Sequence, residues 1–565
     1  MKWRWIIGLA SSFLLVCFMY NELSAVSDIG AGLAATILLR LTSHQNPRSD
    51  QLHKDRLLGG LLEELGSNHV SSCISKRESV LYRKTSPYKP SSYLVSRLRK
   101  YESMHRNCGP GTKPFEESLK LLSQLNMSHD HDHDQCKYLV WLPSNGLGNR
   151  LVSIVSTFLY ALLTDRILLI DESKNIEDLL CEPFENATWL LPPDFPLKNS
   201  FRNFRRGYPH SYGNRIMKNA TNSIIHLPFM YLHLLFDYSE HDKLFYCDEY
   251  QIPLQEIPWL VLRSDEYFAP SLFLMPGYDQ ELERLFPKKD TVFHHLGRYL
   301  FHPSNDVWGL VKRYYNTYLA KADERIGIQI RDFKTTPMAF KWMKKQIFSY
   351  YLPHFTKDES TTSHIRDICS VASLEKHMLD RVISCTFDRQ ILPKLRKTNN
   401  DTIPSGRGKR GSMAILTTSL SLSYYDNIRN MCWEHQTETG EVIGVYQPSH
   451  EDSQQSEEMT HNMKAWAEIY LLSLMDVLIT SPFSTFGYVA QGLGGMQSWI
   501  INSPYREIES SEPSCILGKS MEPCFHSPPY FDCKAKTGAN AGLISPYVQH
   551  CEDLKWGIKL VDDHI

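Results

Sequence analysis

The stretch from Tyr138 to Asp171 constrains the fold more than any other part of the sequence. Tyr138–Leu142 is a short apolar run of strand composition, and a turn with one proline and two glycines follows it. Next come about fifteen helix-compatible residues and a second apolar run, Ile167–Ile170. This order of strand, turn, helix and strand predicts a βαβ unit with two parallel strands.

The turn of this unit lies where α/β folds bind ligands. At the carboxyl end of a parallel strand, a turn that enters a helix presents unpaired N–H groups to an anion, and Gly146 and Gly148 allow close approach of the backbone. The motif reads G-x-G-x-x-L, so the dinucleotide-binding fingerprint fails at Leu151. The spacing alone leaves two interpretations open, an anion-binding turn and a purely structural turn.

A second series of expected elements begins with a helical pattern at 308–322 and an apolar strand at 326–330, which Arg331 follows directly. An arginine at the end of a buried parallel strand is placed where ligands bind, and its fork of N–H donors matches a diphosphate. The competing interpretation is a surface salt bridge. A polar, poorly patterned region, Thr356–Arg410, comes next.

The series then continues to a hydroxyl-rich turn. We expect strands at 414–417, 442–446 and 477–480 and helices at 422–431 and 463–474. The hydroxyls of Ser484 and Thr485, with the N–H groups that follow, form an anion cradle, although serine and threonine also simply cap helices. Two such arrays predict an α/β protein with two Rossmann-like domains facing a cleft. This arrangement suits a nucleotide-sugar glycosyltransferase of the GT-B type.

A carboxylate follows another expected strand, Trp259–Leu262. Asp265 lies shortly after the apolar run and is a candidate general base or acceptor-binding group. The alternative is that Asp265 caps the next helix.

The amino-terminal residues predict a membrane anchor. Lys2 and Arg4 precede the uncharged run 5–20, which is short for a span of ~20 residues but has aromatic flanks. We expect a type II signal anchor with residues 1–4 in the cytosol and a stem at 21–107. A cleaved signal peptide, with Leu23–Ala25 as a poor cleavage site, is the alternative. Either one directs the bulk of the chain into the secretory pathway.

Cysteines and glycosylation motifs agree with that compartment. Twelve cysteines lie beyond the anchor at wide spacings without a C-x-x-C pair, which fits disulfides better than zinc. Asn-x-Ser/Thr sequons begin at Asn126, Asn186, Asn219 and Asn400, and these are candidate glycosylation sites.

Charge argues against a nucleic-acid partner, because 61 basic and 63 acidic residues give a net charge of -2 and a pI of about 6.9.

The segment His129–Asp134 alternates histidine and aspartate, and such a series can bind a divalent metal. A solvated linker is the interpretation we favour. The spaced Asp-x-Asp triplets lie here, away from any expected strand end, so we expect no metal clamp on a nucleotide diphosphate.

Several long motifs resemble the plant xyloglucan fucosyltransferase family. They are YLVWLPSNGLGNRL at 138–151, KADERIGIQIR at 321–331, STFGYVAQGLGG at 484–495, MEPCFHSPPYFDC at 521–533 and HCEDLKWGIKLV at 550–561. The resemblance runs from about Cys136 to the end of the chain. It implies a metal-free Golgi type II enzyme of GT-B-like fold that moves fucose from GDP-fucose to a cell-wall glycan, with inversion and in an α-1,2 linkage. No cofactor is expected, and a homodimer is one option for its assembly.

The resemblance also assigns roles to residues. Arg331 is expected to grip the β-phosphate and stabilise the departing diphosphate, which fits the need for a fixed cation where negative charge develops. The other expected donor-binding residues are Gly146, Gly148, Asn149, Arg150, His450, Ser484, Thr485, Phe486 and Asp553. Asp265 is our candidate for activating the acceptor hydroxyl.

The expected domains are an acceptor-side domain at 108–320, a GDP-fucose-binding domain at 321–510 and a carboxyl-terminal segment at 511–565 that packs back on both. One residue departs from the family pattern: Asp332 follows Arg331, and a carboxylate there can pair with the arginine and weaken its phosphate grip.

Three other functions stay open on the sequence. They are a fucosyltransferase for arabinogalactan protein glycans, a catalytically inactive lumenal glycan-binding protein, and an NAD-dependent oxidoreductase, which Leu151 and the anchor disfavour.

Overall fold

The computed structural model describes residues 57–62, 72–124, 136–172, 175–218, 227–331, 371–396, 411–502 and 512–562. The chain divides into two compact units, Met1–Leu57 and Leu58–Ile565, and the second contains nearly all of the described residues. The expected anchor, the histidine–aspartate repeat, Asp332 and three sequons (Asn126, Asn219 and Asn400) lie outside the described residues. No helix within the described ranges is long and apolar enough to cross a membrane.

The first sheet confirms the predicted βαβ unit. Its four parallel strands have the order β2-β1-β4-β3. They are β1 (Lys137–Leu142), β2 (Arg166–Ile170), β3 (Phe229–Leu234) and β4 (Trp259–Ser264). The strands are almost entirely buried, as expected for a parallel sheet covered on both faces. Helix α6 (Leu147–Leu163) joins β1 to β2, and nearly all of its residues are buried.

The second sheet has six strands in the order β10-β9-β8-β5-β6-β7. They are β5 (Glu324–Gln329), β6 (Ser412–Thr418), β7 (Val442–Tyr446), β8 (Val477–Thr480), β9 (Trp499–Ile501) and β10 (Cys515–Leu517). All neighbours pair in parallel except β9 and β10, which are antiparallel. A separate antiparallel pair, β11 (Val548–His550) and β12 (Ile558–Leu560), follows in the carboxyl-terminal segment.

The helices that accompany these sheets vary from one turn to five. They are α3 (Ile74–Glu78), α4 (Ser92–Cys108), α5 (Lys113–Gln124), α7 (Ile176–Leu179), α8 (Tyr212–Met217), α10 (Asp248–Gln255), α11 (Ala269–Leu272), α12 (Asp279–Leu285), α13 (Val292–Leu300), α14 (Asn305–Tyr314), α17 (Val371–Asp388), α18 (Leu422–Glu434), α19 (Met459–Leu472) and α20 (Thr485–Gly494). A π-helical turn, Tyr315–Leu319, extends α14.

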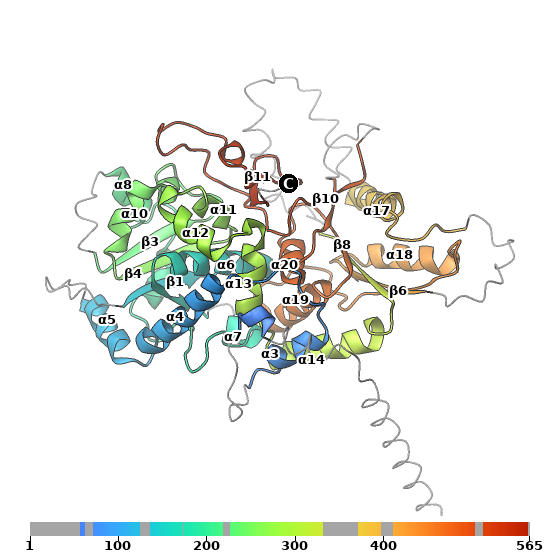
Figure 1. Ribbon diagram of the computed structural model, residues 1–565, viewed down its shortest axis with the longest axis horizontal. Helices are drawn as coiled ribbons and strands as arrows, with labels where there is room; N and C mark the ends of the chain where they lie inside the picture. Colours follow the sequence, from blue (N-terminus) through green and yellow to red (C-terminus); the bar gives the residue numbers. More distant parts are fainter. Residues whose placement is uncertain are drawn as a thin grey trace, which may run out of the picture. The chain divides into compact units, whose positions relative to one another are not determined.

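Three helices pack together where the two sheets meet. Figure 1 shows α6, α13 and α20 side by side, and each of them contacts the other two. Helix α13 lies so close to α20 that a Cβ atom at Gly492 would clash with the ring of Phe293. One continuous core therefore includes side chains from both sheets.

The folded unit begins well before residue 108, where the sequence placed the end of the stem. Leu94, Leu98 and Tyr101 of α4 are fully buried in the core, and the Tyr101 hydroxyl accepts a 2.8 Å hydrogen bond from the Leu168 N–H of β2. A disulfide between Cys73 and Cys181 fixes the preceding segment. The amphipathic pattern of α4 is that of a core helix and not of a spacer.

Helix α17 corrects a second expectation, because it lies in the region 356–410 that the sequence presented as poorly patterned. Cys385 of this helix forms a disulfide with Cys515 of β10, and Met378 and Val382 are buried against the second sheet. The helix packs one side on the sheet and leaves a polar side exposed, and its short apolar stripe is easy to miss within a polar region.

Five disulfides confirm the interpretation of the cysteines. They join Cys73–Cys181, Cys108–Cys136, Cys247–Cys533, Cys385–Cys515 and Cys524–Cys551. Cys432 is outside any disulfide, and Cys369 lies outside the described residues.

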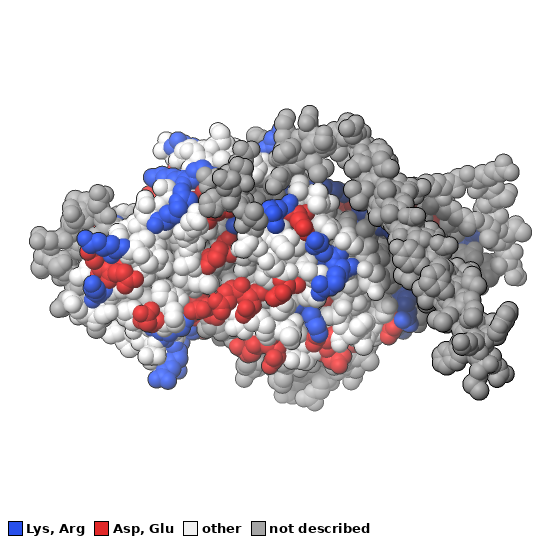
Figure 2. Space-filling model, turned by 90° about the horizontal axis from the view of Figure 1, so that it is seen from below, with Lys and Arg blue, Asp and Glu red and all other residues white. Residues whose placement is uncertain are grey.

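On the face shown in Figure 2, acidic side chains gather in a row across the middle, with lysines and arginines in small separate groups around them.

Candidate active site

The turn between β1 and α6 packs directly against the turn that precedes α20. A Cβ atom at Gly148 would clash with the side chain of Thr485, and one at Gly146 would lie 2.6 Å from the Nε2 of Gln454. Gly148 is therefore required because Thr485 approaches the backbone so closely, whereas the atom near Gly146 is the flexible end of the Gln454 side chain. This contact unites two motifs that are more than 330 residues apart in the sequence.

Asn149 and Arg150 connect this first turn to its neighbours. The Thr485 hydroxyl donates to Asn149 Oδ1 at 3.2 Å, while Asn149 Nδ2 donates to the carbonyl oxygen of Asp265 at 3.1 Å. Arg150 is fully buried; its guanidinium donates to the carbonyl oxygens of Asn145 and Ser456, each at 3.0 Å. Burial lowers the pKa of Arg150, with Glu457 acting in the opposite direction. Arg150 thus joins the first turn to the loop before α19.

The second turn follows β8 and has the strand, turn and helix order that the sequence predicted. Ser484 is the N-cap of α20, and its hydroxyl accepts a hydrogen bond from the Gly487 N–H at 3.5 Å. Phe483, just before the cap, adopts the left-handed conformation with φ of 60°. The first N–H groups of a helix lack intrahelical acceptors, so the start of α20 can receive an anion. Phe486 packs with its partly buried ring against the core.

Arg331 lies beside this second turn. Strands β5 and β8 pair in parallel, so Arg331 and Ser481 leave the sheet at the same edge, and the Arg331 N–H donates to Ser481 Oγ at 2.8 Å. Its Nη2 donates to Gln454 Oε1 at 2.5 Å. Gln454 thereby contacts the guanidinium and also approaches Gly146. The guanidinium, the Ser484 cap and the first turn therefore border one region of the molecule.

Asp265 follows β4 and is only 4% exposed. Asn145 Nδ2 and the Phe236 N–H donate hydrogen bonds to its two carboxylate oxygens. Burial raises the pKa of the Asp265 carboxyl to about 6, although these two hydrogen bonds oppose the shift. A carboxylate with such a pKa is ionised near neutral pH and basic enough to accept a proton.

Glu266 is buried next to Asp265. Burial, followed by the charge of Asp265, raises the pKa of the Glu266 carboxyl well above its usual range. Its Oε2 accepts a hydrogen bond from the His526 N–H at 3.2 Å, which joins the first sheet to the carboxyl-terminal segment. The raised pKa indicates that Glu266 is protonated at the pH where Asp265 carries a charge.

The remaining predicted residues lie away from this region or have other partners. His450 is exposed after β7, with its ring 6.1 Å from that of Tyr425. Asp553 contacts the second turn from the carboxyl-terminal segment, since its Oδ2 accepts the Phe483 N–H at 2.8 Å. Asn186 is exposed in a left-handed turn, a position accessible to a glycan.

Sequence reasoning missed Asn145, Gln454 and Ser481. Asn145 and Ser481 lie in turns that directly follow β1 and β8, so a search of every residue after an expected strand would have included them. Gln454 lies in an acidic, polar loop, and nothing in the local pattern distinguishes it from a solvated residue.

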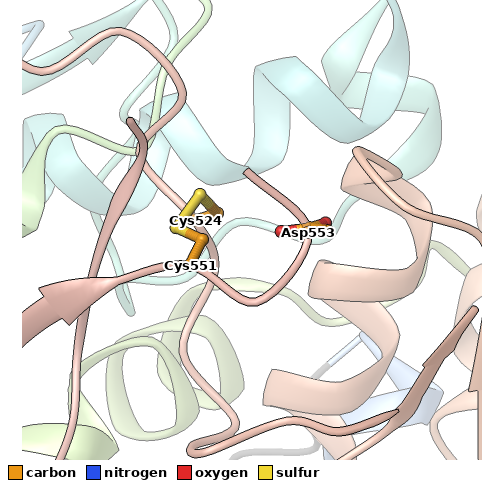
Figure 3. Close-up of side chains that lie close together, drawn as sticks. All are labelled: Cys524, Cys551 and Asp553. Carbon is orange, nitrogen blue, oxygen red and sulfur yellow. A yellow bond between two sulfur atoms is a disulfide. The ribbon is translucent and has the colours of Figure 1, made fainter. Parts of the chain in front are cut away.

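One cluster in the described ranges has the spacing of a metal site. Ligand atoms of Cys524, Cys551 and Asp553 lie within 4.8 Å of one another. Figure 3 shows the three side chains. The two sulfur atoms are bonded to each other in a disulfide, so neither can act as a thiolate ligand. This cluster is a covalent link beside a carboxylate.

Comparisons with known proteins agree with these features. A family model described as xyloglucan fucosyltransferase matches residues 34–376 and 350–534. A galactoside 2-α-L-fucosyltransferase of Pisum sativum is 50% identical over 516 residues, covering 91% of this chain and 84% of that protein. One of Arabidopsis thaliana is 47% identical over 519 residues, covering 91% and 85%. A solved structure of an Arabidopsis thaliana FUT1 mutant in complex with GDP is 47% identical, covers 90% of this chain and 100% of that one, and has a TM-score of 0.74.

Proposed function

Because the chain belongs to the xyloglucan fucosyltransferase family, we propose that it transfers L-fucose from GDP-fucose to the 2-hydroxyl of a galactose in a cell-wall glycan, with xyloglucan as the acceptor. The observation that carries this proposal is the placement of Arg331 beside the turn that enters α20, with Asp265 linked to the start of α20 through Asn149. The relatives support it, since two are named galactoside 2-α-L-fucosyltransferases and a solved relative contains GDP.

On the donor side, Arg331 and the second turn would hold the diphosphate. The guanidinium supplies a fixed positive charge, and the Ser484 hydroxyl with the helix N–H groups supplies dipoles in the neighbouring turn. Their orientation is set by the fold before the reaction begins. They stabilise the negative charge that develops as GDP leaves, which is the main requirement for breaking the bond to fucose.

On the acceptor side, Asp265 would accept the proton of the attacking hydroxyl. The Asn145 amide and the Phe236 N–H fix the carboxylate, and its raised pKa matches the task of a general base. Attack by an activated hydroxyl on the face opposite to the departing GDP inverts the configuration at the fucose carbon. Loss of the proton to Asp265 and loss of GDP then complete a single displacement.

The wider setting of the enzyme forms part of the same proposal. We place the donor and acceptor on the facing sides of two Rossmann-like domains in a GT-B-like arrangement, with no cofactor or metal. The run 5–20 would anchor the chain as a type II protein of the Golgi membrane, with the enzyme in the lumen. A homodimer is one assembly that fits this setting, and nucleic acid is not a partner.

A donor and acceptor assay on the purified full-length chain tests this function. Incubation with GDP-fucose and a galactosylated xyloglucan oligosaccharide is expected to yield an α-1,2-linked product, identified by linkage analysis. An arabinogalactan glycan serves as the competing acceptor in a parallel reaction. Transfer to that glycan alone would reassign the acceptor, and GDP binding without transfer to either would favour a glycan-binding protein.

A further inference from the structure

A short chain of hydrogen bonds supports the second turn from the side of the carboxyl-terminal segment. Asp553 Oδ2 accepts the Phe483 N–H at 2.8 Å and the hydroxyl of Tyr488 at 2.5 Å. Tyr488 lies on α20 one turn after the Ser484 cap, and it is 2% exposed. One carboxylate oxygen therefore binds both the turn and the helix that the turn enters.

The Asp553 contact stabilises an unfavourable conformation. Phe483 has a φ of 60°, which is disfavoured by about 1–2 kcal/mol for a residue with a Cβ atom. Strain of this kind persists only where the surroundings fix the residue. The direction of the N–H groups after Phe483 depends on this conformation, so the carboxylate that holds Phe483 also sets where those groups point.

His526 continues the chain toward the acceptor side. The Tyr488 hydroxyl gives its single proton to Asp553, so it accepts at 3.2 Å from His526, whose Nε2 must carry a hydrogen. Burial lowers the pKa of His526, with the charge of Asp553 acting in the opposite direction. The His526 backbone N–H donates to Glu266. The chain thus connects Phe483 with the residue next to Asp265.

A disulfide fixes the two carboxyl-terminal members of this chain. Cys524 lies two residues before His526, Cys551 lies two residues before Asp553, and the two cysteines are bonded to each other (Figure 3). Phe525, which lies between Cys524 and His526, pairs with Ile558 of strand β12. His526 and Asp553 therefore come from two loops that are covalently tied beside the second turn.

We propose that Asp553, Tyr488 and His526 are positioning residues for the donor, which hold the turn before α20 in the conformation that receives the diphosphate. Asp553 then acts through Phe483 and Tyr488, in place of the direct nucleotide contact that the family resemblance implied for it. This inference rests on the proposed function, because it takes the second turn as the donor site.

Tyr488→Phe tests the proposal with the smallest change, since it removes one hydroxyl and keeps the ring. Calorimetric titration of the full-length chain with GDP is expected to show about a tenfold loss of affinity. The KM for GDP-fucose should rise by a similar factor, while the KM for the acceptor stays within twofold. Tyr547→Phe is the matched control, because the Tyr547 hydroxyl in the carboxyl-terminal segment donates to the Phe273 carbonyl oxygen and takes no part in the hydrogen bonds around Asp553. It should bind GDP as the unaltered protein does.

Asp553→Asn and the double variant separate positioning from direct contact. If Asp553 acts through Tyr488, the combined loss of GDP affinity in Asp553→Asn with Tyr488→Phe is smaller than the product of the single losses. Unchanged GDP affinity in folded Tyr488→Phe overturns the proposal, and a loss confined to Asp553→Asn assigns a direct nucleotide contact instead. GDP binding decides this question even if the unaltered chain transfers no fucose, so failure of the proposed function is recognised separately.

Discussion

The turns that begin α6 and α20 are built in the same way, and they differ in what holds them. Each follows a parallel strand, and each has a left-handed residue just before the helix cap: Asn145 before Gly146 and Phe483 before Ser484. Each left-handed residue donates a hydrogen bond to the side chain of an aspartate. Asn145 uses its side-chain amide to reach Asp265, whereas Phe483 uses its backbone N–H to reach Asp553.

The difference between Asn145 and Phe483 shows which of the two turns depends more on its surroundings. Asparagine tolerates the left-handed conformation better than most residues, so the first turn needs less support at this position, and the Asn145 amide orients the Asp265 carboxylate. Phenylalanine does not tolerate it, so the second turn relies on Asp553 from a distant segment. The first turn thus positions an aspartate, and in the second an aspartate positions the turn.

The largest effect on catalysis should come from Asp265, the aspartate that is hydrogen-bonded to the first turn. If Asp265 is the general base, Asp265→Asn lowers kcat by about a hundredfold or more, because general base catalysis contributes typically 10²–10⁴-fold. Donor binding should persist, and titration with GDP checks this directly. Asp426→Asn, on the exposed surface of α18, is the control. An unaltered turnover rate in Asp265→Asn would remove this residue from the mechanism.

Beside the second turn, Arg331→Ala is expected to weaken GDP binding by about 1.5–3 kcal/mol, or roughly 10- to 150-fold, as for a charge-assisted hydrogen bond. Isothermal titration calorimetry with GDP measures this loss of affinity. Arg429→Ala, which removes the partner of Asp426 on α18, should bind GDP normally. A loss of less than about 1 kcal/mol would contradict a direct grip on the diphosphate.

The pH dependence of the reaction should distinguish the two aspartates. Asp265 must be ionised to accept a proton, and its pKa is raised to about 6, so kcat/KM for the acceptor should fall as the pH drops through about 6. The pH dependence of GDP binding, measured across the same range, should be the same in Asp265→Asn as in the unaltered protein, because Asp265 lies on the acceptor side. A flat rate profile between pH 5 and 7 would argue against Asp265 as the base.

The smallest expected effect concerns the first left-handed residue. Asn145→Ala should lower the free energy of unfolding by about 1–2 kcal/mol, since alanine disfavours this conformation, and Asn145→Gly should recover most of that loss. Both variants lose the amide that lowers the pKa of Asp265. The acidic limb of the rate profile should therefore move to higher pH in both. Denaturant unfolding and pH–rate profiles measure the two effects, and equal stability of the two variants would exclude backbone strain at this position.

The sequence predicted strands β1, β2 and β4 of the first sheet and β5 to β8 of the second, because buried parallel strands are continuous apolar runs bounded by turns. It did not predict β3, the short strands β9 to β12, or the helices α8 and α10 to α13. Strands β7 and β8 begin and end at the predicted residues. Helix α17 escaped prediction because only a narrow stripe of its surface is buried, and α4 was assigned to a stem because its partners on β2 lie far along the chain.

For the candidate site, the sequence proposed Arg331, Ser484 and Asp265 from their positions after strands, and their roles stay predictions. It could not show what holds each turn. The support of Phe483 by Asp553 joins residues 70 positions apart, and the contact of Gly146 with Gln454 depends on how two sheets pack. Neither contact has a local sequence pattern, because the residues that form it are far apart in the sequence and meet only in the folded protein.

The disulfide between Cys247 and Cys533 imposes an order on biosynthesis. The two cysteines are 286 residues apart, and the first lies within the half of the chain that is synthesised first. At about 5–20 residues per second, the ribosome needs roughly 15–60 s to deliver the second thiol after the first. Cys247 must stay unpaired through that interval, although every other cysteine made before Cys533 can compete for it. The native covalent pattern is completed only after Cys551 has been made, which makes early mispairing the characteristic risk of this fold.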